Sequence, residues 1–286
     1  MTPEAFEYHR PATVDEALSL LGEHGDDARL LAGGHSLLPA MKLRLSAPGH
    51  LIDVGQIDEL QQISTDGDDV VIGAGATHHD IESSDVVGEK APLLAQAAGS
   101  IGDVQVRNMG TIGGSLAHAD PAADYPAAVL AANARIRVRG PGGEREIAAS
   151  FFFVELYMTS LAPDEIILDV RVPSQGAGTG SSYAKFPHPA SRFAVCGCAA
   201  SVTRNGGSCS DVRVGFTGIA NAAFRDLGVE DAMNGSSGDS EAISAAAANA
   251  AQGVELLSDS FAGEEYRRHL ASVLAMKALG EAVRAA

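Results

Sequence analysis

Two short glycine-dense bends, each lying between apolar stretches, constrain the fold of this chain more than any other part of its sequence. Residues 32–36 (AGGHS) follow an apolar, strand-like run and lead into an apolar helical turn, and residues 111–115 (TIGGS) precede a helix-like segment. Since glycine lacks a Cβ, consecutive backbone N–H groups in such bends can be directed at one point. Amide groups at a helix start bind anions without any lysine. The pair therefore predicts a site for a phosphate-bearing ligand.

The charge of the chain bears on what such a site could hold. The 286 residues include 37 Asp and Glu but only 20 Lys and Arg, for a net charge of −17. An acidic field repels nucleic acid and anionic membrane surfaces, and the absence of Trp argues against stacking platforms for bases. A diphosphate bound here would depend on local amide dipoles at short range. Neither bend matches G-x-G-x-x-G or G-x-x-x-x-G-K-[ST], so a Rossmann dinucleotide site and a P-loop are both disfavoured.

The N-terminal residues and the cysteines indicate the compartment. The stretch MTPEAFEYHRP lacks the basic start and apolar run of a secretory signal, and no window approaches the ~18 consecutive apolar residues of a spanning helix. We expect a cytoplasmic protein, or one at the inner face of the membrane through a complex. Three cysteines fit a reducing compartment. Pairing about the TRNGGSCS turn sets Cys209 opposite Thr203, roughly five residues from Cys198, which argues against a metal site built from Cys196, Cys198 and Cys209.

Hydrophobic periodicity and turn residues predict the elements of the first half of the chain. A strand, a helix and a second strand are expected within residues 6–34, with Thr13 and Glu16 forming a capping box and Gly25 ending the helix. Another strand is expected at residues 50–55, followed by a polar hinge, so a subdomain boundary falls near residues 55 to 65. The middle third opens with residues 69–76 (DVVIGAGA), and further expected elements are helices at 91–102 and 125–134, a hairpin at 134–148, and a strand at 165–173.

A change of composition predicts a second domain. Residues 174–182 (SQGAGTGSS) have the composition of a linker. Beyond them the pattern predicts three strands and then helices, a small α+β layer structure. The strands are expected at 182–186, 192–204 and 209–220, and the helices at 222–233, 240–254 and 264–283. The predicted domains are therefore 1–175, with subdomains of about 1–55 and 60–175, and 182–286.

Residues 30–45 (LLAGGHSLLPAMKLRL) together with 107–127 (RNMGTIGGSLAHADPAADYPA) closely resemble the flavoprotein, or medium, subunit of the carbon monoxide dehydrogenase and xanthine dehydrogenase family of molybdenum hydroxylases. The resemblance extends over the whole chain, and it supplies the name of the cofactor, FAD. It implies an α+β fold in which two α+β subdomains of the vanillyl-alcohol oxidase (PCMH) type hold FAD. A C-terminal antiparallel three-stranded sheet with helices is expected to follow them.

The resemblance also assigns roles to individual residues. The bends are expected to enclose the pyrophosphate, with glycines where a Cβ would stand between the amides and the phosphate oxygens. Asp124 is expected to accept hydrogen bonds from the cofactor, with a helix cap as its alternative role, and Lys185 to lie near the flavin and favour its reduced, anionic form. Phe193, Ile167 and Ile101 are expected to contact the cofactor, although core packing explains each equally well. The residues of the two bends are Ala32, Gly33, Gly34, His35, Ser36 and Leu37, and Thr111, Ile112, Gly113, Gly114 and Ser115.

The histidines give no metal or catalytic signal in the sequence. His78 and His79 precede Asp80, but adjacent residues of a helix point about 100° apart, so THHDIE indicates a capped helix start. His35 and His118 lie in the bends and are expected to orient the backbone or contact the cofactor. No Ser-His-Asp or paired-carboxylate pattern stands out. We therefore expect neither a metal site nor catalytic residues in this chain.

The resemblance implies an electron-transfer subunit of a larger complex. A large subunit with the molybdenum cofactor would oxidise the substrate, a small subunit with [2Fe–2S] clusters would pass electrons on, and FAD would deliver them to an external acceptor. A dimer of heterotrimers is expected. The substrate (carbon monoxide, an aldehyde, a purine or another N-heterocycle) and the acceptor (quinone, NAD or oxygen) stay open, and residues 187–192 are expected to govern acceptor access. Two alternatives are a self-sufficient reductase of the related cell-wall precursor type and a non-catalytic nucleotide-binding module.

Overall fold

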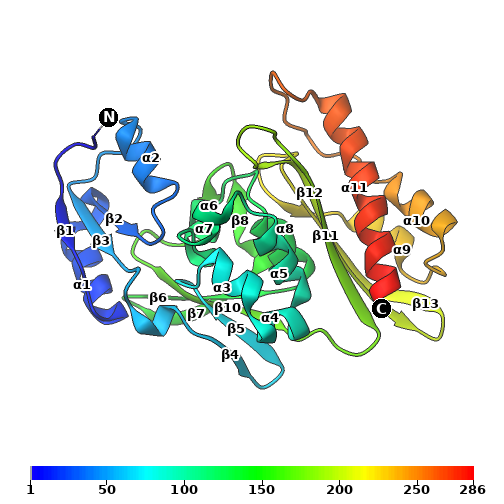
Figure 1. Ribbon diagram of the computed structural model, residues 1–286, viewed down its shortest axis with the longest axis horizontal. Coiled ribbons are helices and arrows are strands. Elements are labelled where there is room, and N and C mark those ends of the chain that lie inside the picture. Colours follow the sequence, from blue (N-terminus) through cyan, green and yellow to red (C-terminus); the bar gives the residue numbers. More distant parts are fainter. Residues whose placement is uncertain (1) are drawn as a thin grey trace.

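The computed structural model describes residues 2–286, in which three layered parts follow one another along the longest axis (Figure 1). The N-terminal part is a three-stranded parallel sheet in the order β1-β3-β2. Helix α1 packs on this sheet, and α2 follows the first glycine bend. The bounds are β1 (Glu7–His9), α1 (Val14–His24), β2 (Ala28–Leu31), α2 (Leu37–Lys42) and β3 (His50–Asp53).

Helix α1 begins and ends where the sequence predicts, but its cap differs in one bond. The Thr13 hydroxyl accepts a hydrogen bond from the Glu16 N–H at 3.2 Å, and Gly25 takes the cap position at φ 53°. The Glu16 carboxylate, however, accepts from the N–H of Ala12 at 2.8 Å and not from that of Thr13. The predicted capping box is therefore only half formed, because the carboxylate reaches one residue further back.

The central part is a five-stranded antiparallel sheet in the order β4-β5-β10-β6-β7, with helices α3 to α8 gathered on one side of it (Figure 1). The predicted hairpin at 134–148 is confirmed, since β6 and β7 pair along their full length. A short hairpin of β8 and β9 follows, which the sequence analysis does not predict. The bounds are β4 (Ile63–Asp66), β5 (Asp69–Gly73), α3 (His78–Ser83), α4 (Asp85–Lys90), α5 (Pro92–Gly99), α6 (Val104–Arg107), α7 (Ile112–His118), α8 (Tyr125–Ala131), β6 (Arg135–Gly140), β7 (Gly143–Ala148), β8 (Phe153–Glu155), β9 (Met158–Thr159) and β10 (Ile166–Pro173).

The C-terminal part is an antiparallel sheet in the order β11-β12-β13-β14, covered by α5 and α8 on one face and by three helices on the other. The long helix α11 crosses β11 and β12 (Figure 1). The α+β class expected from the sequence is confirmed. The bounds are β11 (Thr179–Pro187), β12 (Ala194–Asn205), β13 (Ser208–Thr217), β14 (Phe224–Arg225), α9 (Leu227–Met233), α10 (Ser240–Ala247) and α11 (Glu264–Ala285).

Three details of the C-terminal predictions are wrong. Residues 179–182 belong to β11 and not to a linker, since they pair with β12. Phe224 and Arg225 form a fourth strand, so the helix expected at 222–233 begins only at Leu227. These two residues pair with the edge of β13, so the helix cannot start until after them. Such pairing is a tertiary effect that local helix propensity does not predict.

The cysteines lie in the core between the C-terminal sheet and its helices. The two-residue turn at Gly206 and Gly207 sets Cys209 opposite Arg204, one residue from the predicted partner, Thr203. All three thiols are buried and free. Burial raises the pKa of Cys196 to about 12 and also raises that of Cys198. The thiols of Cys196 and Cys198 are therefore protonated and unreactive at neutral pH.

The buried Arg267 links helix α11 to the ends of strands β12 and β13 in the C-terminal sheet. The Arg267 guanidinium donates to the carbonyl oxygens of Val195 at 2.7 Å and Gly218 at 2.6 Å, and to the Asp259 carboxylate at 2.5 Å. The Arg267 side chain is only 5% exposed. A buried cation held this way satisfies two strand-end carbonyls at once, so its removal leaves them without a donor.

We expect Arg267→Leu to lower the free energy of unfolding of the chain by about 3–5 kcal/mol, because the two buried carbonyls and Asp259 lose their partner. Guanidinium unfolding followed by circular dichroism measures the loss. Arg284→Leu, an exposed arginine near the end of the same helix, is the matched control and should change stability by less than about 0.5 kcal/mol. Equal effects of the two substitutions would contradict this role.

Candidate functional site

The first glycine bend offers a run of backbone N–H groups to solvent. In the described residues, the N–H groups of Gly33, Gly34, His35 and Ser36 donate to no protein acceptor. Gly34 has φ 71°, a conformation that favours glycine, and its carbonyl accepts from the Leu38 N–H at 3.1 Å. The His35 ring Nδ1 lies 3.1 Å from the Gly33 carbonyl oxygen, so this side chain braces the bend. Four adjacent donors without partners form a ready anion site.

The second bend differs from the prediction, because its amides are already used. Gly113 N–H donates to the Ala74 carbonyl at 2.9 Å, and Ile112 N–H donates to that of Ala76 at 3.1 Å. The Gly114 N–H donates to the Thr111 hydroxyl at 3.1 Å, which caps α7. Ser115 N–H donates to the Thr111 carbonyl. The expectation that both bends aim free amides at the ligand is wrong for this one, which can contribute its Ser115 hydroxyl instead.

Close approach between backbones explains the glycines better than room for a ligand. A Cβ on Gly33 would lie 2.0 Å from the Met109 carbonyl oxygen, so this residue lets the first bend rest on the segment that leads into the second. A Cβ on Gly113 would lie 2.7 Å from the Ala74 carbonyl oxygen. At these two positions the predicted reason, clearance for phosphate oxygens, is replaced by clearance for protein backbone.

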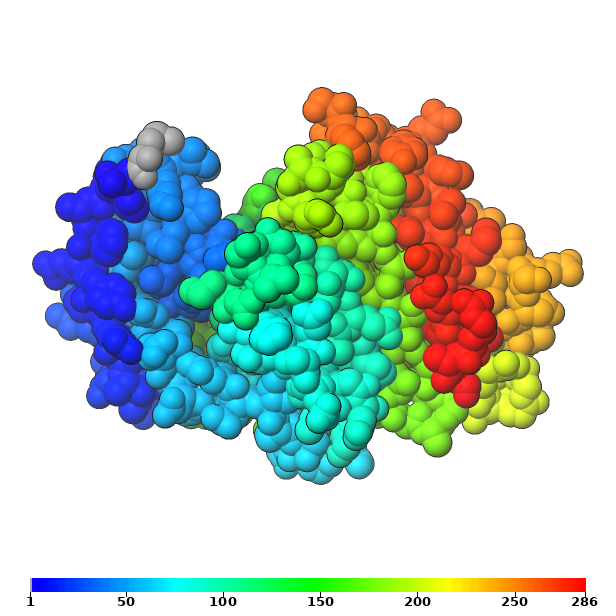
Figure 2. All heavy atoms as spheres, viewed as in Figure 1, coloured from blue at the N-terminus to red at the C-terminus, as the bar shows by residue number. Residues whose placement is uncertain are grey.

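The same packing brings the two bends together. The Cβ position of Gly114 lies 4.0 Å from the Cβ of Ala32, so the bends adjoin although 80 residues separate them in the sequence. The surface is hollowed between the N-terminal part and the yellow-green segment near residue 190 (Figure 2). Helix α2, which starts with Leu37, and helices α6 and α7 lie along this hollow (Figure 1). The two bends thus adjoin at this groove, where Gly114 is exposed and Ser115 half-buried, whereas Thr111, Ile112 and Gly113 are buried beneath the surface.

Asp124 and Lys185 form a buried ion pair. The Lys185 Nζ lies 2.8 Å from Asp124 Oδ2, and the side chains are 7% and 4% exposed. The Tyr183 hydroxyl donates to Asp124 Oδ1 at 2.5 Å, and Lys185 Nζ also donates to the Ser100 carbonyl at 2.9 Å. Asp124 occupies the N-cap position of α8 but its side chain makes no cap hydrogen bond. The alternative role as a helix cap is therefore wrong, because both oxygens face β11.

Burial governs the protonation of Asp124. Desolvation raises the pKa of its carboxyl to about 6, and the Lys185 ammonium and the Tyr183 hydroxyl oppose that rise. The folded chain therefore holds this proton more tightly than an unfolded chain does. The stabilisation that the protonated Asp124 carboxyl contributes to the fold is complete below about pH 4 and is lost as the pH rises through about 6.

The C-terminal part holds the segment between α7 and α8 in place. The Thr217 hydroxyl donates to the carbonyl oxygens of Pro121 at 2.8 Å and Ala123 at 2.6 Å. The Ala194 N–H donates to the Ala122 carbonyl at 3.1 Å, so the neighbouring Phe193, 44% exposed, lies beside this segment. The candidate residues Asp124, Lys185 and Phe193 thus meet at the junction between the central and C-terminal parts.

The remaining candidates lie around this junction. Ile101 is half-buried and follows Ser100, the carbonyl partner of Lys185. Ile167 is 5% exposed and packs in the central core, in agreement with the core-packing alternative for this residue. The His118 ring lies tilted against that of Tyr157 in the β8–β9 hairpin, with the ring centroids 5.1 Å apart.

The His78 environment confirms the predicted helix start and adds a buried base. Thr77 and Asp80 form a capping box at the start of α3. His78 is buried whereas His79 is exposed, so the two rings lie on different sides. Burial lowers the pKa of His78 to about 4, and the charges of His35 and Arg107 contribute. The His78 ring lies against Gly110, where a Cβ would come within 2.5 Å of Nε2, so a neutral imidazole supports the second bend.

Two small hollows lie elsewhere in the described chain. One of about 210 Å³ is lined by the β6–β7 turn, and one of about 190 Å³ lies between α4, β10 and β11. Neither reaches the roughly 300–1,000 Å³ of most small-molecule sites, and neither is lined by any of the predicted site residues. The open groove at the glycine bends remains the candidate site.

Sequence reasoning missed two members of this site. Tyr183 lies two residues before Lys185 on β11, and the alternation of a strand places both on one face, a signal that was present in the sequence. Met109 supports Gly33 through its carbonyl oxygen, and no sequence pattern shows a contact of that kind.

Two known protein families match this chain. The protein-family model described as "FAD binding domain in molybdopterin dehydrogenase" matches residues 4–175, and the one described as "CO dehydrogenase flavoprotein C-terminal domain" matches residues 181–282. The chain is 43% identical over 282 residues to the carbon monoxide dehydrogenase medium chain of Hydrogenophaga pseudoflava, a match that covers 99% of this chain and 98% of that one. It is 35% identical over 281 residues to the glyceraldehyde dehydrogenase medium chain of Sulfolobus acidocaldarius, which covers 98% and 99%.

The structural comparison agrees. The fold matches a solved carbon monoxide dehydrogenase of Hydrogenophaga pseudoflava, which lacks the Mo-pyranopterin moiety, with a TM-score of 0.97, 44% sequence identity and 100% coverage of both chains. The predicted resemblance and FAD-binding fold are confirmed by these matches. The domain limits and the roles of individual residues stay predictions.

We expect the Asp124 carboxyl to titrate near pH 6 in the folded chain, because burial raises its pKa to about 6. Carbon-13 NMR of the side-chain carboxyl measures the midpoint, with Asp124→Asn assigning the signal. Lys185→Met should move the midpoint higher, since the ammonium opposes the rise, and Lys277→Met, an exposed lysine on α11, should leave it unchanged. A wild-type midpoint near 4 would contradict the assigned burial effect.

Proposed function

Because the chain belongs to the family of FAD-binding medium subunits of molybdenum hydroxylases, such as carbon monoxide and xanthine dehydrogenases, we propose that it carries electrons from a partner's [2Fe–2S] clusters to an external acceptor. It is an oxidoreductase subunit whose cofactor is FAD. Bound FAD supplies a centre that takes up electrons singly and gives them up in pairs. The observation that carries the proposal is the groove where the four unpartnered amides of the first bend adjoin the second bend.

The groove fits a diphosphate in an acidic protein. The N–H groups of residues 33–36 bind the phosphate oxygens, and the hydroxyls of Ser36 and Ser115 add donors from the two sides. Amide dipoles act at short range, where they outweigh dispersed carboxylates. The second bend keeps its own amides in internal hydrogen bonds, so its role is to support the first bend and to enclose the ligand.

The buried pair at the junction positions one cation toward the flavin. Lys185 Nζ has three N–H donors, of which Asp124 and the Ser100 carbonyl take two. The third is free for a flavin oxygen or nitrogen, and a cation there favours an anionic ring. Phe193 is exposed enough to lie against a flat ring system, and the half-buried Ile101 lines the apolar side, whereas Ile167, packed in the central core, supports the site from beneath.

The partners follow from the family. We propose a complex with a large molybdenum-cofactor subunit and a small [2Fe–2S] subunit, arranged as a dimer of heterotrimers. Relatives that match almost the full length of this chain are named for carbon monoxide and for glyceraldehyde. Since the same subunit accompanies such different substrates, the choice of substrate lies with the large subunit.

An apolar surface beside the groove is the docking face that we assign to the small subunit. This hairpin surface consists of Phe151, Val154, Leu156, Tyr157 and Met158, whose exposed fractions run from 47% to 75%. Tyr157 contacts His118, the last residue of α7, and its hydroxyl lies 3.4 Å from Asp120. Electron transfer needs the clusters near the flavin, and this surface adjoins the C-terminal end of α7, the helix that begins in the second bend. Exposed apolar patches of this kind mark interaction sites.

Access of the acceptor is assigned to residues 187–192. His188 organises this loop: its N–H donates to the Phe193 carbonyl at 2.8 Å and its carbonyl accepts from the Arg192 N–H at 2.9 Å. Its ring Nδ1 accepts from the N–H groups of Ala190 and Ser191. The loop therefore sets the position of Phe193, and with it the space left over the flavin ring.

Gly33→Ala should weaken FAD binding by at least about tenfold, because the new Cβ meets the Met109 carbonyl and pushes the two bends apart. Titration of the cofactor-free chain with FAD, followed by flavin fluorescence, measures this. Gly22→Ala makes the same substitution on α1 with open space around it, so binding should not change. Unaltered FAD affinity in a folded Gly33→Ala chain would refute the groove as the site.

Replacing both Leu156 and Met158 by Glu should abolish co-purification of the small subunit while the chain keeps its FAD, since two buried charges oppose an apolar interface. Co-expression of the subunits followed by affinity purification tests it. Leu227→Glu changes a more exposed leucine on α9, 62% against 47% for Leu156, and should leave the complex intact. A complete complex with the double variant would show that the small subunit docks elsewhere.

A further inference from the structure

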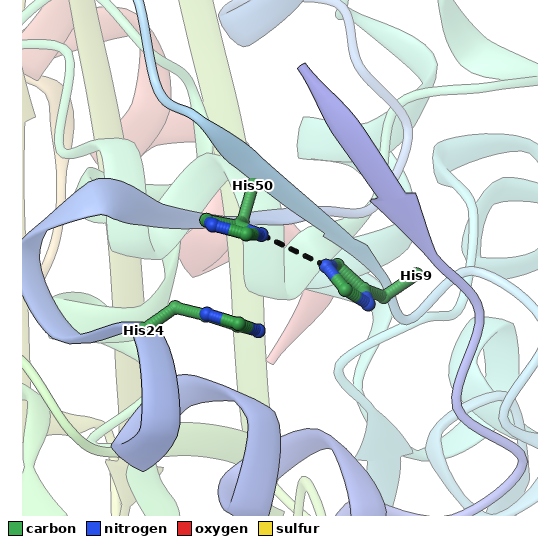
Figure 3. A group of neighbouring side chains, drawn as sticks. All are labelled: His9, His24 and His50. Carbon is green, nitrogen blue, oxygen red and sulfur yellow. Dashed lines mark hydrogen bonds between the residues drawn. The ribbon is translucent and has the colours of Figure 1, made fainter.

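Three histidines from separate elements gather on the N-terminal sheet, apart from the groove. His9 lies on β1, His24 is the last residue of α1, and His50 is the first residue of β3. One nitrogen of each lies within 4.8 Å of the others. Figure 3 shows the rings of His24 and His50 one above the other, with His9 at the side to which a nitrogen of each points. These three residues are the histidine cluster.

The fold, and not local sequence, makes the histidine cluster. Parallel pairing sets Glu7 opposite His50 and His9 opposite Ile52, so all four side chains share one face of the sheet. Ile52 is buried in the core that includes Val14 of α1, which identifies this as the helix-covered face. Helix α1 ends beside it and delivers His24.

The distances suit metal ligation. His9 Nε2 and His50 Nδ1 are 3.0 Å apart. Two nitrogens bound to one tetrahedral Zn²⁺ at about 2.0–2.1 Å are roughly 3.3 Å apart. The rings of His24 and His50 are 3.7 Å apart and within 8° of parallel. All three imidazoles are half-buried, so they are held in place yet reachable by an ion from solvent.

We propose that His9, His24 and His50 bind a divalent transition cation of the zinc class. Neutral imidazole is the preferred side-chain ligand of Zn²⁺, Ni²⁺ and Cu²⁺, and three such ligands plus water complete a tetrahedral site. The nitrogen lone pairs of two parallel, stacked rings cannot point at the same ion. The His24 ring must therefore rotate about its side-chain bonds when the ion binds, and its position at the end of α1 permits this. The Glu7 carboxylate, 3.7 Å from His50 Nδ1 and 76% exposed, offsets the charge of the ion or replaces the water.

The place of the histidine cluster suggests what the ion does. Ala28, the first residue of β2, pairs with His50, and the first glycine bend follows Leu31 at the other end of the same strand. The ion would join β1, α1 and β3 and so hold the sheet that carries the bend. It lies away from the proposed electron path, so its effect is on stability and not on the redox chemistry.

The expectation of no metal site, drawn from the sequence, is revised by this proposal. The three histidines are separated by 15 residues (9 to 24) and by 26 residues (24 to 50). Zinc motifs recognised in sequence have at least one short spacing, such as H-x₃₋₅-H. Parallel pairing of β1 and β3 brings His9 and His50 together, and the packing of α1 on the sheet adds His24.

The test uses the full chain without a histidine tag, first dialysed against a chelator, and titrated with ZnCl₂ in a calorimeter. We expect one Zn²⁺ per chain, and binding weaker by at least about tenfold in His24→Gln and in His50→Gln, since a lost ligand costs more than a lost outer partner. His269→Gln, an exposed histidine on α11, is the matched control and should bind as the wild type does. Zn²⁺ at roughly 100 times its Kd should raise the Tm of the wild type by about 5 °C, and that of the two cluster variants far less.

A second measurement covers the case in which a cluster variant fails to fold. One equivalent of Cu²⁺ added to the wild-type chain should give an electron paramagnetic resonance spectrum with splitting from several imidazole nitrogens. A spectrum without nitrogen splitting overturns the proposal. Equal Zn²⁺ binding by the wild type, both cluster variants and the control also overturns it, because such binding comes from scattered surface groups.

Discussion

The contact between Gly33 and the Met109 carbonyl is the constraint on which the candidate site depends. A side chain at residue 33 would separate two bends that lie 80 residues apart in the sequence, and the groove between them would open. The two bends have different roles: the first presents amides without partners, and the amides of the second donate to Ala74 and Ala76, just after β5, and to the cap of α7. Anion binding by one rigidly supported loop suits an acidic chain, because its donors need no reorganisation when the ligand arrives.

The junction with the C-terminal part sets the electrostatics of the site. Asp124 belongs to the central part, whereas its partners Tyr183 and Lys185 lie on β11 of the C-terminal sheet. The backbone of the intervening segment is held by Thr217 of the same sheet. The two parts therefore complete one site, and the cation proposed to face the flavin stays in place only while both are docked.

Local sequence signals gave most of the elements, and long-range contacts explain what they missed. The hairpin at 134–148 and the capped start of α3 follow from alternation and from Thr77 with Asp80, both of which act within a few residues. The strand at Phe224 depends on pairing with Phe216 of β13, and the satisfied amide of Gly113 depends on the distant Ala74 carbonyl. The sequence predicts the two bends because glycine and hydroxyl residues mark them. It does not predict why the glycines are needed, because composition does not show which backbone segment lies next to them. The histidine cluster escaped for the same reason.

The burial of the cysteine thiols affects how well the chain resists oxidation by products of its own redox reaction. Where dioxygen serves as electron acceptor, its two-electron reduction releases hydrogen peroxide beside the protein. Peroxide attacks thiolates, and a thiol such as Cys196, with a pKa of about 12, is almost entirely protonated and shielded from solvent. The C-terminal core can therefore contain sulfur without becoming a target for oxidative damage during turnover.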